Sequence, residues 1–236
     1  MSVWEERART VADARAVNTP NFLQRELELD AIEPYLSSDL HVLEVGCGNG
    51  WTSAWLAERV ARVTAIDVSD EMILRARREH PDSRIDFRTG DIRTGDGLSR
   101  PSWDLILCIR VLINLTNLDE QRAALAVLAR HLTSDGRLIL AEGFLDGFLA
   151  INELRQAAGE DPIIPAPINC YSTLADLAEA LPAELEVEGR FHLGAFDYLT
   201  RIAGCDPELA VRLARAYNPA ELERFSRLRG FVLRRA

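Results

Sequence analysis

The sequence lacks a long hydrophobic run. No stretch of the 236 residues reaches the roughly 18 consecutive apolar residues that suggest a membrane-spanning helix. The first residues, MSVWEERARTVADARAV, carry charges throughout, so they do not resemble a secretory signal peptide, which has an apolar centre. We therefore expect a cytoplasmic protein without a membrane partner.

Cysteine is scarce and widely spaced. The chain has four cysteines, and no two of them form a C-x-x-C pair. Its four histidines are equally scattered. Structural zinc sites and disulfide frameworks require ligands at close and regular spacing. We therefore expect reduced thiols and no bound metal.

Basic charge is also in deficit. The formal net charge is −10 and the sequence pI is about 5.0. Proteins that bind nucleic acids present a basic face, so a nucleic-acid partner is disfavoured. No internal repeat or low-complexity tract is apparent, and the length suits one large α/β domain. The acidity favours work on a small-molecule substrate.

One stretch organises the rest of the chain. Val42 to Gly50, VLEVGCGNG, is an apolar run that breaks into three alternating glycines before a helical pattern begins at Trp51. Such a strand, glycine turn and helix can hold a nucleotide-like ligand against the main chain. A second apolar run ends in Asp67, where a parallel strand would place a carboxylate near ribose hydroxyls.

The pattern E-x-G-x-G-x-G from Glu44 to Gly50, followed by Asp67, resembles the class I S-adenosylmethionine-dependent methyltransferases of the small-molecule type. The dinucleotide pattern G-x-G-x-x-G would need glycine where Trp51 stands, which weighs against a nicotinamide-dependent reductase. The resemblance implies S-adenosylmethionine as the cofactor and S-adenosylhomocysteine as the product. It implies cofactor contacts from Arg25, Glu44, Gly46, Cys47, Gly48, Asp67, Val68, Met72, Asp91, Ile92 and Cys108.

Strand and helix patterns alternate regularly from His41 onward. This alternation predicts a Rossmann-like α/β fold, with a mostly parallel seven-stranded sheet covered by helices on both faces. We predict strands at 41–45, 62–67, 84–89, 103–109, 136–142, 185–195 and 230–234, and core helices at 51–60, 69–79 and 118–132. The chain is predicted to form a single domain over residues 1–236.

Three segments fall outside this core. Residues 1–36 read as two helices that resemble an N-terminal lid, which makes Trp4, Asn18 and Phe22 candidate ligand neighbours. Residues 143–171 and 196–227 are long inserts, and we predict that they form a cap over a substrate pocket. A homodimer interface is the alternative use of the inserts.

The acceptor site is the least defined part of the prediction. His192 and Glu142 are the candidate catalytic residues, although His192 also fits a satisfied strand histidine and Glu142 a turn cap. A guanidinium can hold a carboxylate or a phosphate, so Arg110 is a candidate substrate ligand. The remaining candidate substrate ligands are Asn169, Tyr171 and Tyr198.

The resemblance implies in-line methyl transfer to nitrogen or oxygen of a small polar organic molecule, such as a sugar, a metabolite or a natural-product precursor. The Asn/Asp-Pro-Pro-aromatic signature of DNA methylases is absent, because Arg110 to Asn114 reads RVLIN. Protein methylation and a non-catalytic partner protein that binds S-adenosylmethionine remain as alternatives. The sequence does not identify the acceptor.

Overall fold

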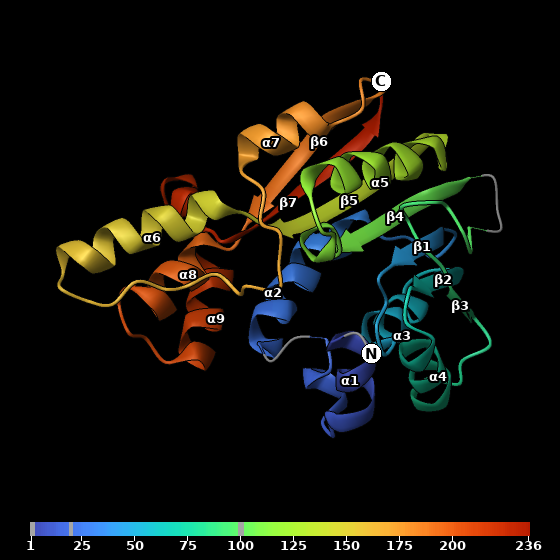
Figure 1. Cartoon of the computed structure of the whole chain (residues 1–236), viewed down its shortest axis with the longest axis horizontal. Helices are drawn as coiled ribbons and strands as arrows, with labels where there is room; N and C mark the ends of the chain where they lie inside the picture. The colour runs from blue at the N-terminus through green and yellow to red at the C-terminus, as the bar shows by residue number, and fades with distance from the viewer. Residues whose placement is uncertain (1–2, 19–20, 99–101) are drawn as a thin grey trace.

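A computed structural model describes residues 3–18, 21–98 and 102–236 (Figure 1). Its centre is a seven-stranded sheet of order β3-β2-β1-β4-β5-β7-β6. Pairs among β1 to β5 are parallel, whereas β7 is antiparallel to both β5 and β6. The strands are β1 (His41–Val45), β2 (Arg62–Asp67), β3 (Ile85–Thr89), β4 (Trp103–Ile109), β5 (Leu132–Gly143), β6 (Leu185–His192) and β7 (Leu228–Arg235). The predicted mostly parallel sheet is confirmed.

Helices cover both faces of the sheet. In Figure 1, α5 and α7 lie above it, and α2, α3 and α4 lie below it. Separate hydrophobic clusters fill the two interfaces, with Leu125 and Leu138 in one and Leu56 and Ile139 in the other. None of the helices in the described part of the chain has the length and apolar character needed to cross a membrane. The helices covering the sheet are α2 (Phe22–Ile32), α3 (Trp51–Ala57), α4 (Asp70–Glu79), α5 (Leu118–Arg130) and α7 (Leu174–Ala180).

Side-chain caps fix where the helices begin. The Ser69 hydroxyl accepts a hydrogen bond from Met72 N (3.3 Å) at the start of α4, and Asn117 caps α5 in the same way. Thr173 and Asp176 form a reciprocal capping box at α7. These caps satisfy N–H groups that the first helical turn leaves unpaired. The helix starts are therefore local properties of the sequence.

The strand order creates a crevice between β1 and β4. The chain runs from β1 outward through β2 to β3, and then returns to the other side of β1 as β4. The connections that follow these two strands therefore diverge, and ligands of open parallel sheets bind at such a switch point beyond the carboxyl ends of the strands. Gly46 and Arg110 stand at these two strand ends.

The N-terminal segment lies against α4 next to this crevice. It consists of α1 (Val3–Thr10) and a short 3-10 helix, η1 (Ala14–Ala16), instead of one continuous helix. The Arg75 guanidinium of α4 donates hydrogen bonds to the carbonyl oxygens of Ala8 (2.9 Å) and Val11 (2.7 Å). Residues 19 and 20, which stand between the two predicted helices, lie outside the described residues.

The two inserts lie at one end of the molecule, where the second insert packs beside α2 (Figure 1). They contribute α6 (Leu145–Ala157), α8 (Gly194–Arg201), α9 (Pro207–Ala216) and the 3-10 helix η4 (Ala220–Phe225). The α8 helix packs against α9 and η4, and α9 packs against α2. The predicted strand 185–195 is too long, because its ladder ends at His192 and the next backbone N–H, of Leu193, bonds to the Ser226 hydroxyl (2.7 Å).

A buried ion pair joins the two ends of the second insert, next to the start of β7. Asp197 of α8 is 1% exposed, and its carboxylate accepts hydrogen bonds from Arg227 N (2.8 Å), Nε (2.9 Å) and Nη2 (2.6 Å). We predict that Asp197→Asn lowers the free energy of unfolding by about 3 kcal/mol, because it leaves a half-buried guanidinium without its charge partner. Denaturant titration measures this change.

The control for that prediction is Glu186→Gln. Glu186 pairs with Arg234, and both side chains are about half exposed (46% and 54%). Exposed pairs contribute less than about 1 kcal/mol. Equal losses in the two variants would contradict an anchoring role for Asp197.

Candidate functional site

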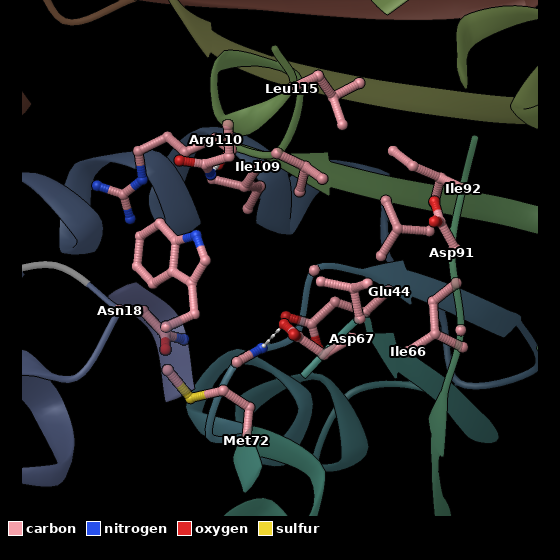
Figure 2. A pocket seen from close by; sticks show the side chains of 18 of the residues that line it. Asn18, Glu44, Ile66, Asp67, Met72, Asp91, Ile92, Ile109, Arg110 and Leu115 are labelled. Carbon is pink, nitrogen blue, oxygen red and sulfur yellow. Dashed lines mark hydrogen bonds between the residues drawn. The ribbon is translucent and has the colours of Figure 1, made fainter. Parts of the chain in front are cut away.

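A cavity of about 230 Å³ opens at the switch point. It is lined by the ends of β1, β2 and β4, by the residues that follow β3, and by α2 and the N-terminal segment. Figure 2 shows Asp67 near its centre, with Asp91 and Ile92 on one side and Arg110 on the other. The cavity is therefore elongated across the carboxyl ends of the strands.

The glycine turn forms the floor of the cavity. Gly46 and Gly48 have φ values of +66° and +56°, in the left-handed region that side chains disfavour. Gly48 N donates a hydrogen bond to Asp67 Oδ2 (2.8 Å; Figure 2), which ties the turn to the end of β2. The Asn18 side chain lies over the turn, and its Nδ2 donates to Cys47 O (3.3 Å). The N-terminal segment thus closes one side of the cavity.

Asp67 is held from both sides. Its Oδ1 accepts a hydrogen bond from Ser69 N (2.9 Å), and its Oδ2 accepts the bond from Gly48. Burial raises the pKa of this carboxyl, and the backbone hydrogen bonds oppose that shift. The predicted neighbours Val68 and Met72 also line the cavity here. The carboxylate is therefore fixed in position before any ligand arrives.

Beyond the end of β3, the predicted cofactor neighbours Asp91 and Ile92 line the cavity. Asp91 also accepts a bidentate pair of bonds from Arg93, Nε to Oδ1 (3.0 Å) and Nη2 to Oδ2 (2.6 Å). This hydrogen bonding lowers the pKa of Asp91, so the group stays ionised. Arg93 lines the cavity too, and it was not predicted.

Two charged residues one turn apart on α2 face the cavity. Arg25 is 4% exposed, its guanidinium lies 5.2 Å from the centre of the Trp51 ring, and its Nη1 has no hydrogen-bond partner. Burial, and then the charge of Arg110, lower the pKa of Arg25 to about 10. Glu28 is fully buried, and its Oε1 accepts a bond from Gln24 Nε2 (3.1 Å). Sequence analysis predicted Arg25 and missed Glu28.

Glu44 lies at the end of β1 and is 5% exposed. The Ser53 hydroxyl of α3 donates a short hydrogen bond to its Oε2. Burial raises the pKa of Glu44 to about 7, against the lowering effects of Ser53 and Arg25. Near neutral pH this carboxyl is therefore a mixture of neutral and ionised forms.

Arg110 has an unusual backbone conformation. It follows β4 with a φ of +54°, the one positive φ of a non-glycine residue in the described part of the chain. Arg110 N donates to Ala141 O (2.8 Å), and Asn114 Nδ2 donates to Arg110 O (2.6 Å). Its guanidinium Nη2 lies 3.3 Å from Glu28 Oε2. A strained residue persists only where its surroundings hold it, and such residues cluster at functional sites.

Glu142, a predicted catalytic residue, lies beneath the turn after Arg110 and does not line the cavity. It is 2% exposed, and its carboxylate accepts bonds from Val111 N (2.8 Å), Leu112 N (2.9 Å) and Ile113 N (3.4 Å). Burial raises its pKa to about 7, which the three backbone bonds oppose. The turn-capping alternative describes this residue better than catalysis does.

The other predicted acceptor residues are not brought to the cavity. His192 lies beside a second, more open pocket between β6, α2 and α9, and burial lowers its pKa. Asn169 Nδ2 donates to Tyr171 Oη (3.0 Å), while the rings of Tyr171 and Tyr198 pack against Phe148 and Phe225. No described residue of 143–171 or 196–227 lines the cavity, so the inserts do not roof it. Instead, α8 and α9 of the second insert cluster with Leu27 behind α2, and α6 of the first insert packs against η4.

Two predicted cysteine contacts are also absent from the cavity wall. Cys47 and Cys108 are 1% and 0% exposed, and burial raises the pKa of both thiols. Each belongs to a hydrophobic core cluster. Of the predicted lid neighbours, Trp4 and Asn18 line the cavity, and Phe22 does not.

Several lining residues were missed in the sequence. Val111, Asn114, Leu115 and Thr116 directly follow β4, so the strand-end rule that found Asp67 would also have found them. Glu28 stands three residues after Arg25, on the same face of a helix. No group of three histidine, cysteine, aspartate or glutamate residues suited to a metal occurs within 3–18, 21–98 and 102–236.

Comparison with known proteins agrees with this geometry. Residues 42–136 match the family described as "Methyltransferase domain". Ubiquinone biosynthesis O-methyltransferase of Xanthomonas oryzae pv. oryzae is 29% identical over 132 residues, which cover 55% of this chain and 54% of that protein. An uncharacterized methyltransferase of Mycobacterium tuberculosis is 32% identical over 97 residues, 41% of this chain and 47% of that protein. The chain thus spans about half the length of these curated relatives.

Solved structures share the fold over nearly the whole chain. The N-methyltransferase NodS of Bradyrhizobium japonicum, in complex with S-adenosylhomocysteine, has a TM-score of 0.62 at 18% identity and covers 98% of this chain and 95% of its own. The magnesium protoporphyrin IX methyltransferase ChlM of Synechocystis, with the same compound bound, has a TM-score of 0.64 at 19% identity and covers 99% and 93%.

The parallel sheet, the glycine turn at the switch point and the carboxylate after β2 define an α/β protein built to bind a nucleotide-like cofactor. Combined with the family match over residues 42–136, they agree with the resemblance to the class I S-adenosylmethionine-dependent methyltransferases. The resemblance seen in the sequence is confirmed.

The raised pKa of Glu44 predicts a pH-dependent stability. Because its folded pKa of about 7 exceeds the model-peptide value of 4.5, the folded state binds more protons between these values, and stability falls as pH rises through that window. We predict that the free energy of unfolding of the wild type, minus that of Glu44→Gln, falls by about 3 kcal/mol between pH 4.5 and 7. Urea titration across this range measures the difference.

Taking the difference between the two proteins isolates Glu44. Other carboxyls, such as Asp82 and Glu188, have a pKa that is lowered by arginine partners, so they make the protein more stable as pH rises. Their contribution is the same in both proteins and cancels in the difference. Parallel curves for the wild type and Glu44→Gln would contradict the assigned shift.

Proposed function

We propose that this protein transfers a methyl group from S-adenosylmethionine to nitrogen or oxygen of a small polar organic molecule. The observation that carries the proposal is the elongated cavity at the switch point, which joins the glycine turn and Asp67 to the turn after β4. S-adenosylmethionine supplies an activated methyl group on a sulfonium sulfur. The protein then needs mainly to align an acceptor with that group.

The residues present fit the cofactor in three places. Asp67 offers fixed carboxylate oxygens to ribose hydroxyls, and Asp91 offers an ionised acceptor to an adenine amino group. Arg25 has a buried donor, Nη1, that lacks a partner and suits a methionine carboxylate. We name the cavity wall of Gly46, Gly48, Asp67 and Asp91 the donor half.

The wall formed by Arg110, Val111, Asn114 and Leu115, together with Glu28, is the acceptor half. It lies on the β4 side of the switch point, opposite the donor half (Figure 2). Its apolar side chains and few polar groups suit a small organic molecule. Glu44 is the cavity carboxyl whose pKa, about 7, is matched to accepting a proton from an amine or hydroxyl.

The first test measures cofactor binding. We predict that the wild type binds S-adenosylhomocysteine in calorimetry, and that Asp67→Ala weakens binding by about 10- to 100-fold, because hydrogen bonds to a charged group are lost. Asp86→Ala is the control, since Asp86 is an acidic residue of β3 that pairs with Arg88 outside the cavity. Unchanged binding by Asp67→Ala would contradict the assignment of the donor half.

The second test separates the alternatives. Cell extract is divided by size, and each fraction is incubated with the protein and S-adenosylmethionine labelled in the methyl group. Label in the small-molecule fraction supports the proposal. Label in protein supports the protein methyltransferase alternative, and cofactor binding without any transfer supports a non-catalytic partner protein.

A further inference from the structure

The acceptor half contains a charge arrangement that methyl transfer alone does not explain. Arg110 projects into the cavity from a strained turn that is held by Ala141, Asn114 and Glu142. A glycine would occupy this backbone conformation without strain. Holding an arginine there places a guanidinium at a fixed point on the β4 side of the cavity.

Glu28, the ion-pair partner of Arg110, uses only part of the hydrogen-bonding capacity of the guanidinium. Glu28 Oε2 lies 3.3 Å from Arg110 Nη2, yet this oxygen is fully buried and forms no hydrogen bond. A structural Arg–carboxylate pair usually forms short, parallel hydrogen bonds. The Arg110 side chain also keeps 19% of its surface exposed. The guanidinium therefore retains donors directed at something other than Glu28.

The charges around Arg110 favour an anion. The charge of Arg110 is close enough to Arg25 to lower the pKa of Arg25, and the Glu28 carboxyl lies within ion-pair distance of Arg110. Glu44 carries only part of a negative charge near pH 7 because its pKa is about 7. A monoanion on Arg110 would therefore meet little like charge, whereas the nearby carboxylates would repel a dianion.

The two arginines have different neighbours. Arg25 stacks over Trp51, the first residue of the helix after the glycine turn, so it belongs to the donor half. Arg110 follows β4 on the other side of the switch point, beside the apolar side chains of Val111 and Leu115. A cofactor carboxylate on Arg25 would therefore leave Arg110 to bind a group on the acceptor.

We propose that the methyl acceptor is a small organic acid, and that Arg110 binds its carboxylate while Glu28 orients the guanidinium from behind. This inference rests on the proposed function, because it concerns the acceptor of that same site. Ile109, Val111 and Leu115 contact the apolar body of the acid. Arg110 is thus a specificity-determining residue, and Glu28 is a positioning residue.

The test uses matched acids and amides on protein saturated with S-adenosylhomocysteine. The pairs are 4-hydroxybenzoate with 4-hydroxybenzamide, 3,4-dihydroxybenzoate with its amide, and anthranilate with anthranilamide. We expect at least one acid to bind about 10- to 100-fold more tightly than its amide, the range of a charge-assisted hydrogen bond. In Arg110→Gln this preference should fall to less than about threefold, while S-adenosylhomocysteine binding stays within about threefold of wild type.

Arg110→Gln leaves Glu28 buried without its partner, so a double variant guards against misfolding. Glu28→Gln with Arg110→Gln removes both charges, and it should also bind S-adenosylhomocysteine while losing the preference for acids. Arg215→Gln is the matched control. Arg215 of α9 donates hydrogen bonds to Glu26 and Asp30, which lie on the outward face of α2, the helix that carries Glu28. This control should keep the full preference.

Two outcomes would overturn the inference. The first is that no acid binds the wild type better than its amide, including the case in which none of the six compounds binds. The second is that phenyl phosphate binds more tightly than benzoate, which would assign the acceptor half to a dianion. In both cases intact binding of S-adenosylhomocysteine leaves the proposed function standing, whereas loss of that binding from the wild type would remove the proposed function itself.

Discussion

The buried carboxylate of Glu142 is the constraint on which the cavity depends. It lies at the end of β5 and accepts hydrogen bonds from three backbone N–H groups of the turn that follows β4. A carboxylate in the interior is tolerated only when such donors satisfy it. The bonds fix a turn that would otherwise be free to move, and that turn carries every acceptor-half residue after β4. The shape of the acceptor half is therefore set by a residue that no ligand touches.

The two sides of the switch point form cavity surfaces of different character. On the β1 and β2 side, glycine backbone and Asp67 make a rigid surface whose hydrogen bonds are already formed in the free protein. On the β4 side, a strained arginine and apolar side chains make a surface with unsatisfied charge. The first surface suits a ligand that is always the same, and the second suits a ligand that distinguishes this protein from its relatives.

The sequence predicted the sheet and most of the donor half because both follow from local patterns. An apolar run that ends in glycine or aspartate marks a strand end, and strand ends of a parallel sheet converge. His192 also ends a strand, but β6 is the outer strand, four positions from β1 in the sheet. At about 4.8 Å per strand this places β6 roughly 19 Å from β1. His192 therefore lies away from the cavity because of the strand order, which the sequence does not reveal.

The inserts and Arg110 could not be placed from the sequence for different reasons. The direction in which an insert folds depends on tertiary contacts, here the apolar cluster that α8 and α9 form with Leu27. The positive φ of Arg110 is imposed by Glu142 and Asn114, and arginine has no local preference for that conformation. Glu142 itself was correctly located at a strand end, but only the structure shows that its carboxylate faces backbone and not ligand.

Both faces of the α2 helix affect recognition, although only one of them lines the cavity. Its inward face presents Arg25 and Glu28, and on its other side Leu27 packs in an apolar cluster with residues of α9. The position of α2 therefore depends on its packing against α9. Substitutions in this apolar contact that shift α2 by a fraction of an ångström would change which acceptor fits, although every residue of the cavity wall stays the same. Relatives with identical cavity-lining residues but different residues at the contact between α9 and α2 need not share a substrate.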